Sequence, residues 1–398
     1  SNAETWQTID IDNGEEVELG LRIKFDGTPS VGEINYVWRR NNFVFGSDPI
    51  EDEQYTQADQ TYQIKLTVYG QGGQNSSVTK TIHVAEGMEV AFVVGGTPQQ
   101  NSNANSGMTI RGNVAWILKE SGRLAVVDLG NENEPGLIAV HQVAPSGRDV
   151  AVSESLIAVA AGSSGVYLLD PMSAANPTGL QLGHYNTYAV DGSYAYSVAF
   201  ATSGFHQYLY VGCGANIKVL NVDDPTNPTL VTTFSPGGFT TGRMIAVDGR
   251  LYASAQAPLG VRVINIVDPT QPTVVGSAAT LRLPLNLAIE GQVMAVAEKN
   301  EYQFGVGTIA FFTLEDPDHP ALLSRLGEQT SYTAVALHGS VAYATAGSGL
   351  ELVNIVDPRT PYVQSSVNLA YDARNIRVIN NKPVAGVGPG AYVVGVNP

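Results

Sequence analysis

The sequence predicts an all-β protein in which an N-terminal β-sandwich is followed by a seven-bladed β-propeller. Three observations support this fold class. The chain of 398 residues contains 42 glycines, and its 18 tyrosines outnumber its 11 phenylalanines, a profile typical of short strands joined by tight turns. Polar and apolar residues alternate before residue 86, and one motif recurs from residue 87 onward. With 43% apolar residues the chain can bury a sizeable core, which excludes global disorder.

The charge balance excludes two classes of partner. The chain carries 37 acidic and 21 basic residues and a formal net charge of −16. Such a protein repels phosphate backbones and anionic lipid head groups at long range, so we expect neither nucleic acid nor a membrane surface as a partner. No run approaches about 18 uninterrupted apolar residues, so the sequence predicts no transmembrane segment.

The beginning of the chain and its cysteine content bear on its origin. Ser1-Asn2-Ala3 is typical of the remnant of an expression tag, and we leave residues 1–3 out of the domain assignment. We expect a secretion signal or anchor segment to precede this sequence in the native protein. The single cysteine, Cys213, excludes an intrachain disulfide. It fits the cytosol and also a bacterial surface protein that avoids thiols.

Residues 4–86 form the predicted N-terminal domain. Residues 62–68 and 78–84 alternate with period two, which is typical of strands with one buried and one solvated face, as in an antiparallel sandwich. A Gly-rich hairpin loop at residues 69–75 joins them, and Trp38 is a candidate core residue. This segment resembles a PKD-like domain of bacterial surface proteins, which implies an immunoglobulin-like sandwich. It departs from that family at Arg39-Arg40-Asn41-Asn42, where the family has an Asp-rich turn.

Residues 87–398 consist of repeats. An apolar strand ends in Asp, which is usually followed by Pro, and a second Pro follows soon after. The motif aspartates are Asp128, Asp170, Asp224, Asp268, Asp316 and Asp357, spaced by 42, 54, 44, 48 and 41 residues. A seventh unit at residues 376–396 lacks the Asp-Pro turn. About 45 residues per unit is the length that a four-stranded propeller blade needs.

One strand outside the repeats predicts how the ring closes. Residues 90–94 read as a strand that belongs to no repeat, whereas the seventh unit lacks its fourth strand. We therefore expect this N-terminal strand to complete the last blade, which leaves no open sheet edge.

The repeats resemble the LVIVD repeat of bacterial and archaeal extracellular propellers. The segments VRVINIVDP at residues 261–269 and LELVNIVDP at residues 350–358 carry the likeness most clearly. The resemblance spans about three-quarters of the chain and implies an exported, surface-exposed propeller. It implies no reaction.

The Asp-Pro motifs admit two interpretations. Asp followed by Pro suits a type I turn, because Asp hydrogen-bonds the turn backbone and Pro fixes φ. The alternative is a ring of calcium-binding carboxylates. We favour the turn, because each motif lies between two strands. The six histidines show no metal-site spacing and Cys213 has no partner cysteine, so we predict no metal site and no cofactor.

One equivalent position in the repeats contains the candidate site. It lies two residues before the core of each first, channel-lining strand, where the side chain should reach one mouth of the channel. In order, it holds Ser106, Arg148, Tyr196, Arg243, Leu285, Thr333 and Arg374. Three converging guanidinium groups would focus positive potential and bind carboxylate, sulfate or phosphate.

Aromatic residues near these arginines extend the candidate site. Tyr185, Tyr188, Phe239, Tyr332 and Tyr371 lie in the same loops and would stack on sugar rings. The predicted ligand-binding residues are Arg148, Arg243, Arg374, Tyr196, Tyr332 and Tyr371. The alternative is that each arginine pairs with an acid such as Asp149 or Asp372 and braces adjacent blades. Both interpretations stay open on the sequence alone.

We predict a non-catalytic, cell-surface or secreted binding module whose propeller mouth recognises a glycan, including an anionic one, or a protein. The alternative is an extracellular hydrolase or lyase with its site at the channel mouth. The strand cores that line the channel are mostly Ala, Val, Ile and Leu, which argues against catalysis there. Carboxylates from loops, such as Asp149, Glu328 or Asp372, keep this alternative open. A structural platform that binds proteins with its flat faces is a third hypothesis.

Overall fold

The structure is a computed structural model that describes most of the chain. The described residues are 6–8, 15–18, 22–26, 33–48, 50–54, 60–70, 75–85, 89–92, 105–130, 136–171, 181–238, 242–256, 258–299, 307–330, 332–369, 373–379, 382–387 and 390–395. The chain divides into two compact units. The first consists mainly of Ser1–Glu89, and the second of Val90–Pro361 and Val367–Gly395.

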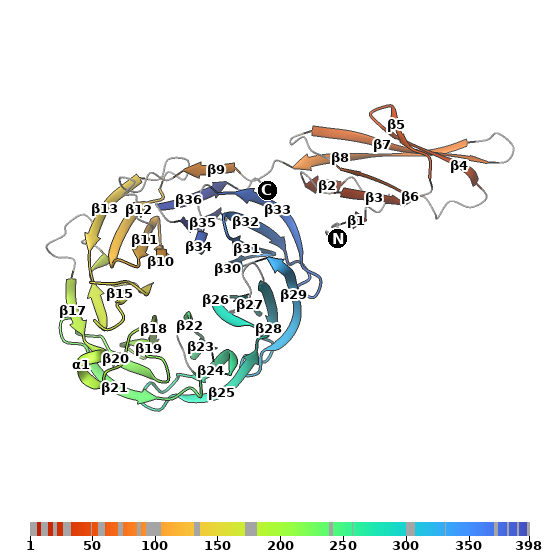
Figure 1. Ribbon diagram of the computed structural model, residues 1–398. Helices are drawn as coiled ribbons and strands as arrows, with labels where there is room; N and C mark the ends of the chain where they lie inside the picture. The colour runs from red at the N-terminus through yellow and green to blue at the C-terminus, as the bar shows by residue number, and fades with distance from the viewer. Residues whose placement is uncertain are drawn as a thin grey trace. The chain divides into compact units, whose positions relative to one another are not determined.

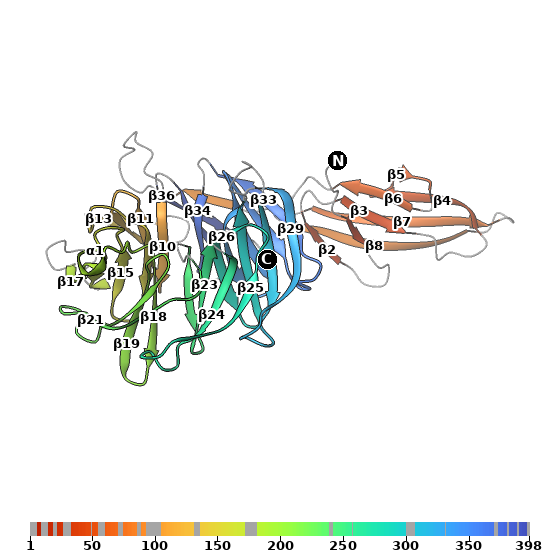
Figure 2. The ribbon, with the colours of Figure 1, turned by 60° about the horizontal axis from the view of Figure 1, so that its bottom comes forward.

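The N-terminal unit contains a three-stranded and a five-stranded sheet. The smaller sheet has the order β1 (Trp6–Thr8), β3 (Arg22–Asp26) and β6 (Ile50–Gln54). The larger sheet has the order β2 (Glu15–Glu18), β8 (Asn75–Ala85), β7 (Gln60–Gly70), β4 (Glu33–Arg40) and β5 (Phe43–Gly46). The pairs β1–β3 and β2–β8 are parallel, and the other pairs are antiparallel. Figures 1 and 2 both show the two sheets next to each other.

On β7 the side chains follow the predicted alternation only in part, because Thr67 is buried as well as its neighbours Leu66 and Val68. Ile64 and Leu66 on β7 are buried, whereas Gln63 on the same strand is exposed. Trp38 on β4 is only 1% exposed, and its indole Nε1 donates a hydrogen bond to the backbone oxygen of Asp48 at 2.9 Å. The prediction of Trp38 as a core residue is therefore confirmed.

The turn that departs from the PKD pattern is a tight hairpin between β4 and β5. Asn41 and Asn42 have φ angles of 45° and 74°, in the left-handed region that Asn tolerates better than most residues. Arg40 pairs with Phe43 across this two-residue loop. Two successive positive φ values are the requirement of a type I′ turn, which matches the strand twist. The two asparagines thus explain why a short hairpin forms here.

The second unit contains seven four-stranded sheets among the described residues. The first three are β10 (Asn105–Arg111), β11 (Val114–Lys119), β12 (Arg123–Asp128) and β13 (Gly136–Gln142); β14 (Asp149–Val152), β15 (Ile157–Ala160), β16 (Val166–Leu169) and β17 (Gln181–Tyr185); and β18 (Ser197–Ser203), β19 (His206–Gly212), β20 (Ile217–Asn221) and β21 (Thr229–Phe234). The fourth and fifth are β22 (Met244–Val247), β23 (Arg250–Gln256), β24 (Leu259–Asn265) and β25 (Thr273–Ala279); and β26 (Leu283–Glu290), β27 (Val293–Lys299), β28 (Gly307–Thr313) and β29 (Ala321–Thr330). The sixth is β30 (Tyr332–His338), β31 (Val341–Ala346), β32 (Gly349–Asn354) and β33 (Tyr362–Asn368). The seventh is β34 (Ala373–Ile379), β35 (Lys382–Val387), β36 (Gly390–Gly395) and β9 (Glu89–Phe92).

These sheets surround a common axis in the manner of a β-propeller. Figure 1 shows the first strand of each sheet, from β10 to β34, nearest the centre of the ring and the fourth strand at its periphery. The seventh sheet takes its fourth strand, β9, from the chain segment that precedes the first sheet. This is the N-terminal strand that the sequence predicts to complete the last sheet.

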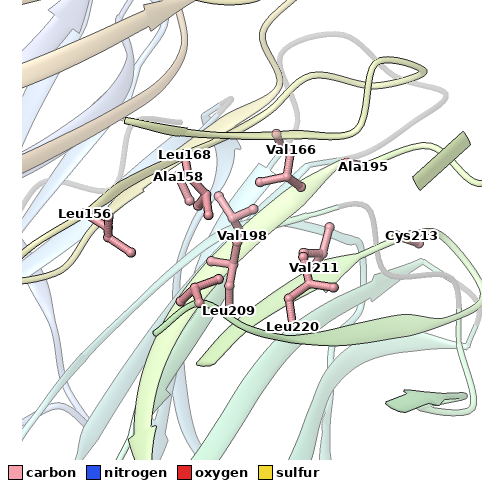
Figure 3. Packing of buried hydrophobic residues seen from close by; sticks show 12 residues of the cluster. Leu156, Ala158, Val166, Leu168, Ala195, Val198, Leu209, Val211, Cys213 and Leu220 are labelled. Atoms are coloured by element: carbon pink, nitrogen blue, oxygen red, sulfur yellow. The ribbon is translucent and has the colours of Figure 1, made fainter. Parts of the chain in front are cut away.

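The apolar core lies between neighbouring sheets. One cluster contains Leu156 and Leu168 of the second sheet and Val198 and Leu209 of the third, and Figure 3 shows these side chains directed toward one another. Another cluster joins Met108 of the first sheet to Val384 of the seventh. Burying each Leu, Val or Met side chain contributes about 1.5–3 kcal/mol to the free energy of unfolding. These clusters therefore hold neighbouring sheets together.

The Asp-Pro motifs form the predicted turns. The Oδ1 atom of Asp268 accepts hydrogen bonds from the backbone N and the Oγ1 of Thr270, at 2.9 and 2.7 Å. The backbone N of Gln271 donates to the carbonyl oxygen of Asp268 at 3.2 Å. Asp224, Asp316 and Asp357 make the same backbone contacts two and three residues ahead. The turn interpretation is confirmed for these four motifs.

Candidate ligand site at the channel mouth

A cavity of about 500 Å³ lies at one end of the central channel. Its lining includes residues of six sheets and, at the fourth, Gly242 and Arg243 directly before β22, so it lies on the axis of the ring. The seven residues that repeat alignment singled out all line it, and we call them the mouth ring: Ser106, Arg148, Tyr196, Arg243, Leu285, Thr333 and Arg374. Arg148 and Arg374 are exposed, and the other five are partly buried.

Local backbone irregularity directs these side chains into the cavity. In four sheets the ring residue is the extra residue of a β-bulge at the start of the first strand: Ser106, Leu285, Thr333 and Arg374. In the other three sheets it directly precedes the first strand: Arg148, Tyr196 and Arg243. A bulge interrupts the alternation of a strand and re-aims one side chain. The ring is thus built by a feature that repeats around the axis.

Two of the three ring arginines are exposed. Arg374 lies 3.5 Å from Glu120 of the first sheet, measured from Nη1 to Oε1, and both side chains are about half exposed. A solvated ion pair of this kind contributes only about 0–1 kcal/mol. Within the described part of the chain, the guanidinium of Arg148 has no hydrogen bond or ion pair. Arg148 is therefore available to a ligand, and Arg374 is only weakly held.

Arg243 faces a buried acid. Asp149 is 8% exposed, and its two carboxylate oxygens accept hydrogen bonds from the backbone N of Val150 at 2.9 Å and of Val198 at 3.1 Å. Burial raises the pKa of the Asp149 carboxyl, and the positive charge of Arg243 opposes this. Burial likewise lowers the pKa of the Arg243 guanidinium, which Asp149 opposes. Asp149 thus braces the second sheet against the third and offsets the charge of Arg243.

The residues next to the ring give the cavity a polar floor. Ser197 and Asn286, each one residue after a ring position, are 1% and 6% exposed. Among the described residues, the Oγ of Ser197, the Oδ1 of Asn286 and the Nε of Arg243 are buried without a hydrogen-bond partner. Buried polar atoms are almost always hydrogen-bonded in folded proteins. Three such atoms thus belong to residues that line this cavity.

An aromatic surface leads out of the cavity along the third sheet. The ring of Tyr196 stacks on that of Tyr194, with centroids 6.2 Å apart, and Tyr194 meets Tyr188 edge to face at 5.5 Å. Tyr188 and Tyr194 are 49% and 44% exposed. We call Tyr188, Tyr194 and Tyr196 the tyrosine surface. It offers aromatic faces flanked by hydroxyl groups, which suits a ligand with both apolar and polar sides.

A short helix that the sequence analysis did not predict holds part of this surface. Helix α1 (Thr187–Asp191) carries Tyr188. The Oδ1 of Asn186 caps it by accepting a hydrogen bond from the backbone N of Ala189 at 2.9 Å, and Gly192 ends it in the left-handed conformation. The buried Lys218 donates to Asp191 at the end of the helix. The Asn-cap and Gly-end pattern was the signal that would have revealed this helix.

Two predicted ligand-binding tyrosines need separate comment. Tyr332 is only 1% exposed, and its hydroxyl donates a hydrogen bond to Oε2 of Glu351 at 2.6 Å. The prediction that Tyr332 stacks on a ligand is therefore wrong, because the side chain precedes the bulged Thr333 and is directed into the sheet interior. Tyr371, like Asp372 and Phe239, lies outside the described residues.

The charges around the cavity favour an anion. Lys299 at the end of β27, which the sequence analysis missed, joins the three arginines in the lining, together with the carboxylates of Glu120 and Asp149. Four cationic groups thus face two acidic ones in a protein whose formal net charge is −16. In the part of the chain that the structure describes, no group of three or more His, Cys, Asp or Glu side chains is placed to hold a metal ion. The lining is therefore suited to an anionic ligand.

A second, larger cavity lies at the opposite ends of the inner strands. Its volume is about 800 Å³, and it lies between hairpins of the second, third and fourth sheets. Its charged residues are Glu154, His206 and Asp248, and His206 already pairs with Asp223 at 2.5 Å. It draws on three sheets only and has no converging set of cations, so the mouth cavity is the better candidate site.

Comparison with known proteins identifies no family. No protein-family model matches the chain, and no curated protein matches it. Among solved structures, the computationally designed Ika8 protein is similar with a TM-score of 0.51 and 14% identity, covering 78% of this chain and all of that one. BamB from Moraxella catarrhalis matches with a TM-score of 0.48 and 17% identity over 77% of this chain and 88% of its own. Likeness at this identity concerns the fold alone. Among the described residues, no helix is long and apolar enough to span a membrane.

The buried and exposed acids together predict a stability maximum on the acidic side of neutrality. Burial raises the pKa of Asp149, Glu298 and Glu351, so the folded chain holds protons there that the unfolded chain releases. That stability is lost as the pH rises through the raised values. Hydrogen bonds from Thr270 and His319 lower the pKa of Asp268 and Asp316 from the ordinary value of 3.8. Their contribution to the free energy of unfolding is therefore present above pH 3.8 and is lost as the pH falls below that value.

We therefore expect a larger free energy of unfolding at about pH 5 than at about pH 8. Urea unfolding at the two pH values measures it. Glu351→Gln removes one of the three carboxyls with a raised pKa. It should therefore reduce the difference in the free energy of unfolding between about pH 5 and about pH 8. A free energy that rises from pH 5 to pH 8 would contradict the assignment of these buried acids.

Proposed function

We propose that the protein is a non-catalytic, secreted or cell-surface binding module whose channel mouth recognises an acidic glycan. In this proposal the seven four-stranded sheets are the blades of a closed, LVIVD-type propeller. The N-terminal unit is a PKD-like, immunoglobulin-type domain that serves as a spacer. The observation that carries the proposal is the mouth cavity, which is lined by all seven residues of the mouth ring, three of them arginines.

Three features of the cavity support a saccharide with carboxylate or sulfate groups. The planar guanidinium of the exposed Arg148 can donate two parallel hydrogen bonds to such a group. Ser197 and Asn286 add polar side chains to the cavity lining, a residue type that suits sugar hydroxyls. The tyrosine surface supplies aromatic faces against which the less polar face of a sugar ring can pack.

The hydrolase alternative receives less support from the carboxylates that line the cavity. Both oxygens of Asp149 accept backbone hydrogen bonds, and Glu120 pairs with Arg374. A pair of carboxylates that face each other across a scissile bond would be expected of most glycosidases. Asp372 and the side chain of Glu328, which the sequence analysis offered for this role, lie outside the described residues.

A thermal-shift screen of neutral and acidic oligosaccharides tests the proposal. Wild-type protein should be stabilised by oligouronides or sulfated oligosaccharides more than by neutral ones of equal length. Arg148→Ala should weaken binding of the acidic ligands about tenfold and leave neutral ligands unaffected, because the lost contact is a charge-assisted hydrogen bond. Tyr194→Ala should weaken both classes, because ring packing does not depend on ligand charge.

Arg359 provides the matched control. It is an exposed arginine in an Asp-Pro turn, 3.8 Å from Asp357, and it does not line the mouth cavity. Arg359→Ala should leave all affinities unchanged. Equal losses of affinity for acidic ligands in Arg148→Ala and Arg359→Ala would mean that binding depends on the overall charge of the protein and not on the mouth cavity. That result would overturn the proposal.

A further inference from the structure

One arginine inside the channel has no counterpart in the other sheets. Three residues after each mouth-ring position, the chain carries a small side chain in six sheets: Thr109, Ala151, Ala199, Ala246, Ala288 and Ala336. In the seventh sheet the same position, on β34, is Arg377. A long cationic side chain among alanines needs a physical explanation that the fold does not provide.

Arg377 and Arg243 line one inner cavity of the channel. This cavity of about 360 Å³ lies among the fourth to seventh sheets, and its wall is otherwise mostly apolar. Arg243 also lines the mouth cavity, so the two spaces share this side chain. The inner cavity therefore lies next to the mouth cavity, on the channel side of it.

Both guanidinium groups carry buried nitrogen atoms that lack partners. In the described part of the chain, the Nη2 of Arg377 and the Nε of Arg243 have no hydrogen-bond acceptor. Among the described residues, the Arg377 guanidinium donates one hydrogen bond, from Nη1 to the carbonyl oxygen of its own neighbour, Ile376, at 2.5 Å. That contact braces no other sheet. Burying a charged donor without a partner is costly, and an oxyanion would remove that cost.

Besides the two arginines, an acidic residue lines the inner cavity. This residue, Glu290, accepts a hydrogen bond from the backbone N of Gly339 at 3.1 Å and lies 3.8 Å from Nδ1 of His338. The Glu290 carboxylate thus has partners of its own, and Arg243 and Arg377 line the same cavity. The arrangement favours an anion that comes from the mouth side.

We propose that Arg377 and Arg243 form an inner seat for a single carboxylate or sulfate group, which belongs to the terminal acidic sugar of the ligand. This inference rests on the proposed function and specifies the end of the glycan that enters the channel. A volume of about 360 Å³ is at the small end of ligand pockets, which suits one sugar unit. The planar guanidinium groups match the geometry of carboxylate and sulfate oxygens.

Thermal shift with monosaccharides tests the seat separately from the mouth. The probes are sodium glucuronate, sodium sulfate and glucose, each at matched ionic strength. Glucuronate at about 100 times its dissociation constant should raise the Tm of the wild-type chain by roughly 3–5 °C, and glucose should not. Arg377→Ala, which restores the alanine of the other sheets, should abolish this shift. Arg377→Met serves as a second variant of similar volume.

The variants without ligand provide an internal control. Because Arg377 makes no bond to another sheet within the described part of the chain, both variants should melt at the wild-type temperature or above it. Arg148→Ala should retain the glucuronate shift while it loses affinity for longer oligouronides. Arg377→Ala should lose the glucuronate shift while it retains more of its affinity for longer oligouronides. A glucuronate or sulfate shift that survives in both Arg377 variants overturns the seat. Oligouronide binding that depends on Arg148 alone would leave the mouth proposal standing and reject the seat, whereas the absence of any acidic-sugar effect rejects both.

Discussion

Asp149→Ala is expected to lower the free energy of unfolding by about 2–4 kcal/mol. The buried carboxylate accepts hydrogen bonds from Val150 and, across to the third sheet, from Val198. Its removal leaves these two backbone N–H groups without acceptors and takes away the negative charge that opposes Arg243. Urea denaturation measures the loss, and Glu315→Ala, which removes an exposed carboxylate, should change it by less than about 0.5 kcal/mol.

Asp149→Asn separates the two roles of this residue. It keeps one acceptor oxygen, so it should cost less than the alanine variant. It also removes a negative charge from the lining of the mouth cavity, so acidic ligands should bind more tightly than to wild type. Weaker binding of acidic ligands by the folded Asp149→Asn variant would contradict the view that the charges of this lining select an anion.

Gly276→Ala is expected to lower the free energy of unfolding by about 2–4 kcal/mol, although it adds a single methyl group. Gly276 lies on β25 at the bulge of the fourth sheet, and a Cβ there would lie 1.7 Å from the backbone oxygen of Asp318 in the Asp-Pro turn of the fifth. A Cβ at Gly183 would likewise lie 1.9 Å from the backbone oxygen of Pro225 in the next sheet. The backbone itself must move to admit the methyl group, so adjacent sheets must separate.

Gly136→Ala is the matched control for Gly276→Ala. Gly136 opens β13, and a Cβ there would meet nothing within 4 Å. This substitution should change the free energy of unfolding by less than about 0.5 kcal/mol. Equal stability of the Gly276 and Gly136 variants would show that the turn of one sheet does not pack against the outer strand of the previous one.

The sequence was most informative where a residue pattern repeats. Asp268 and its equivalents form turns because the Asp side chain and the following residues make local hydrogen bonds. The mouth ring was found by alignment alone, because one bulge or strand start recurs in every sheet and places equivalent side chains at the same height. The strand that closes the seventh sheet followed from counting strands.

The remaining site residues depend on three-dimensional contacts that no repeat encodes. Lys299 reaches the cavity from the end of a second strand, and the burial of Tyr332 depends on its bond to Glu351. The sequence analysis did not single out Arg377, and only the cavity that it lines gives this residue a meaning. Residue composition alone gave no indication of the short helix that carries Tyr188.

The central claim is that the mouth arginines bind a ligand rather than brace the sheets. Calorimetric titration of an oligouronide into wild-type protein and into the triple variant Arg148→Ala/Arg243→Ala/Arg374→Ala tests it most directly. We expect wild-type binding that weakens as salt rises, and at least about a hundredfold loss of affinity in a triple variant that remains folded. A triple variant that melts well below wild type, while neither protein binds any acidic glycan, would contradict the claim and identify these arginines as braces between the sheets.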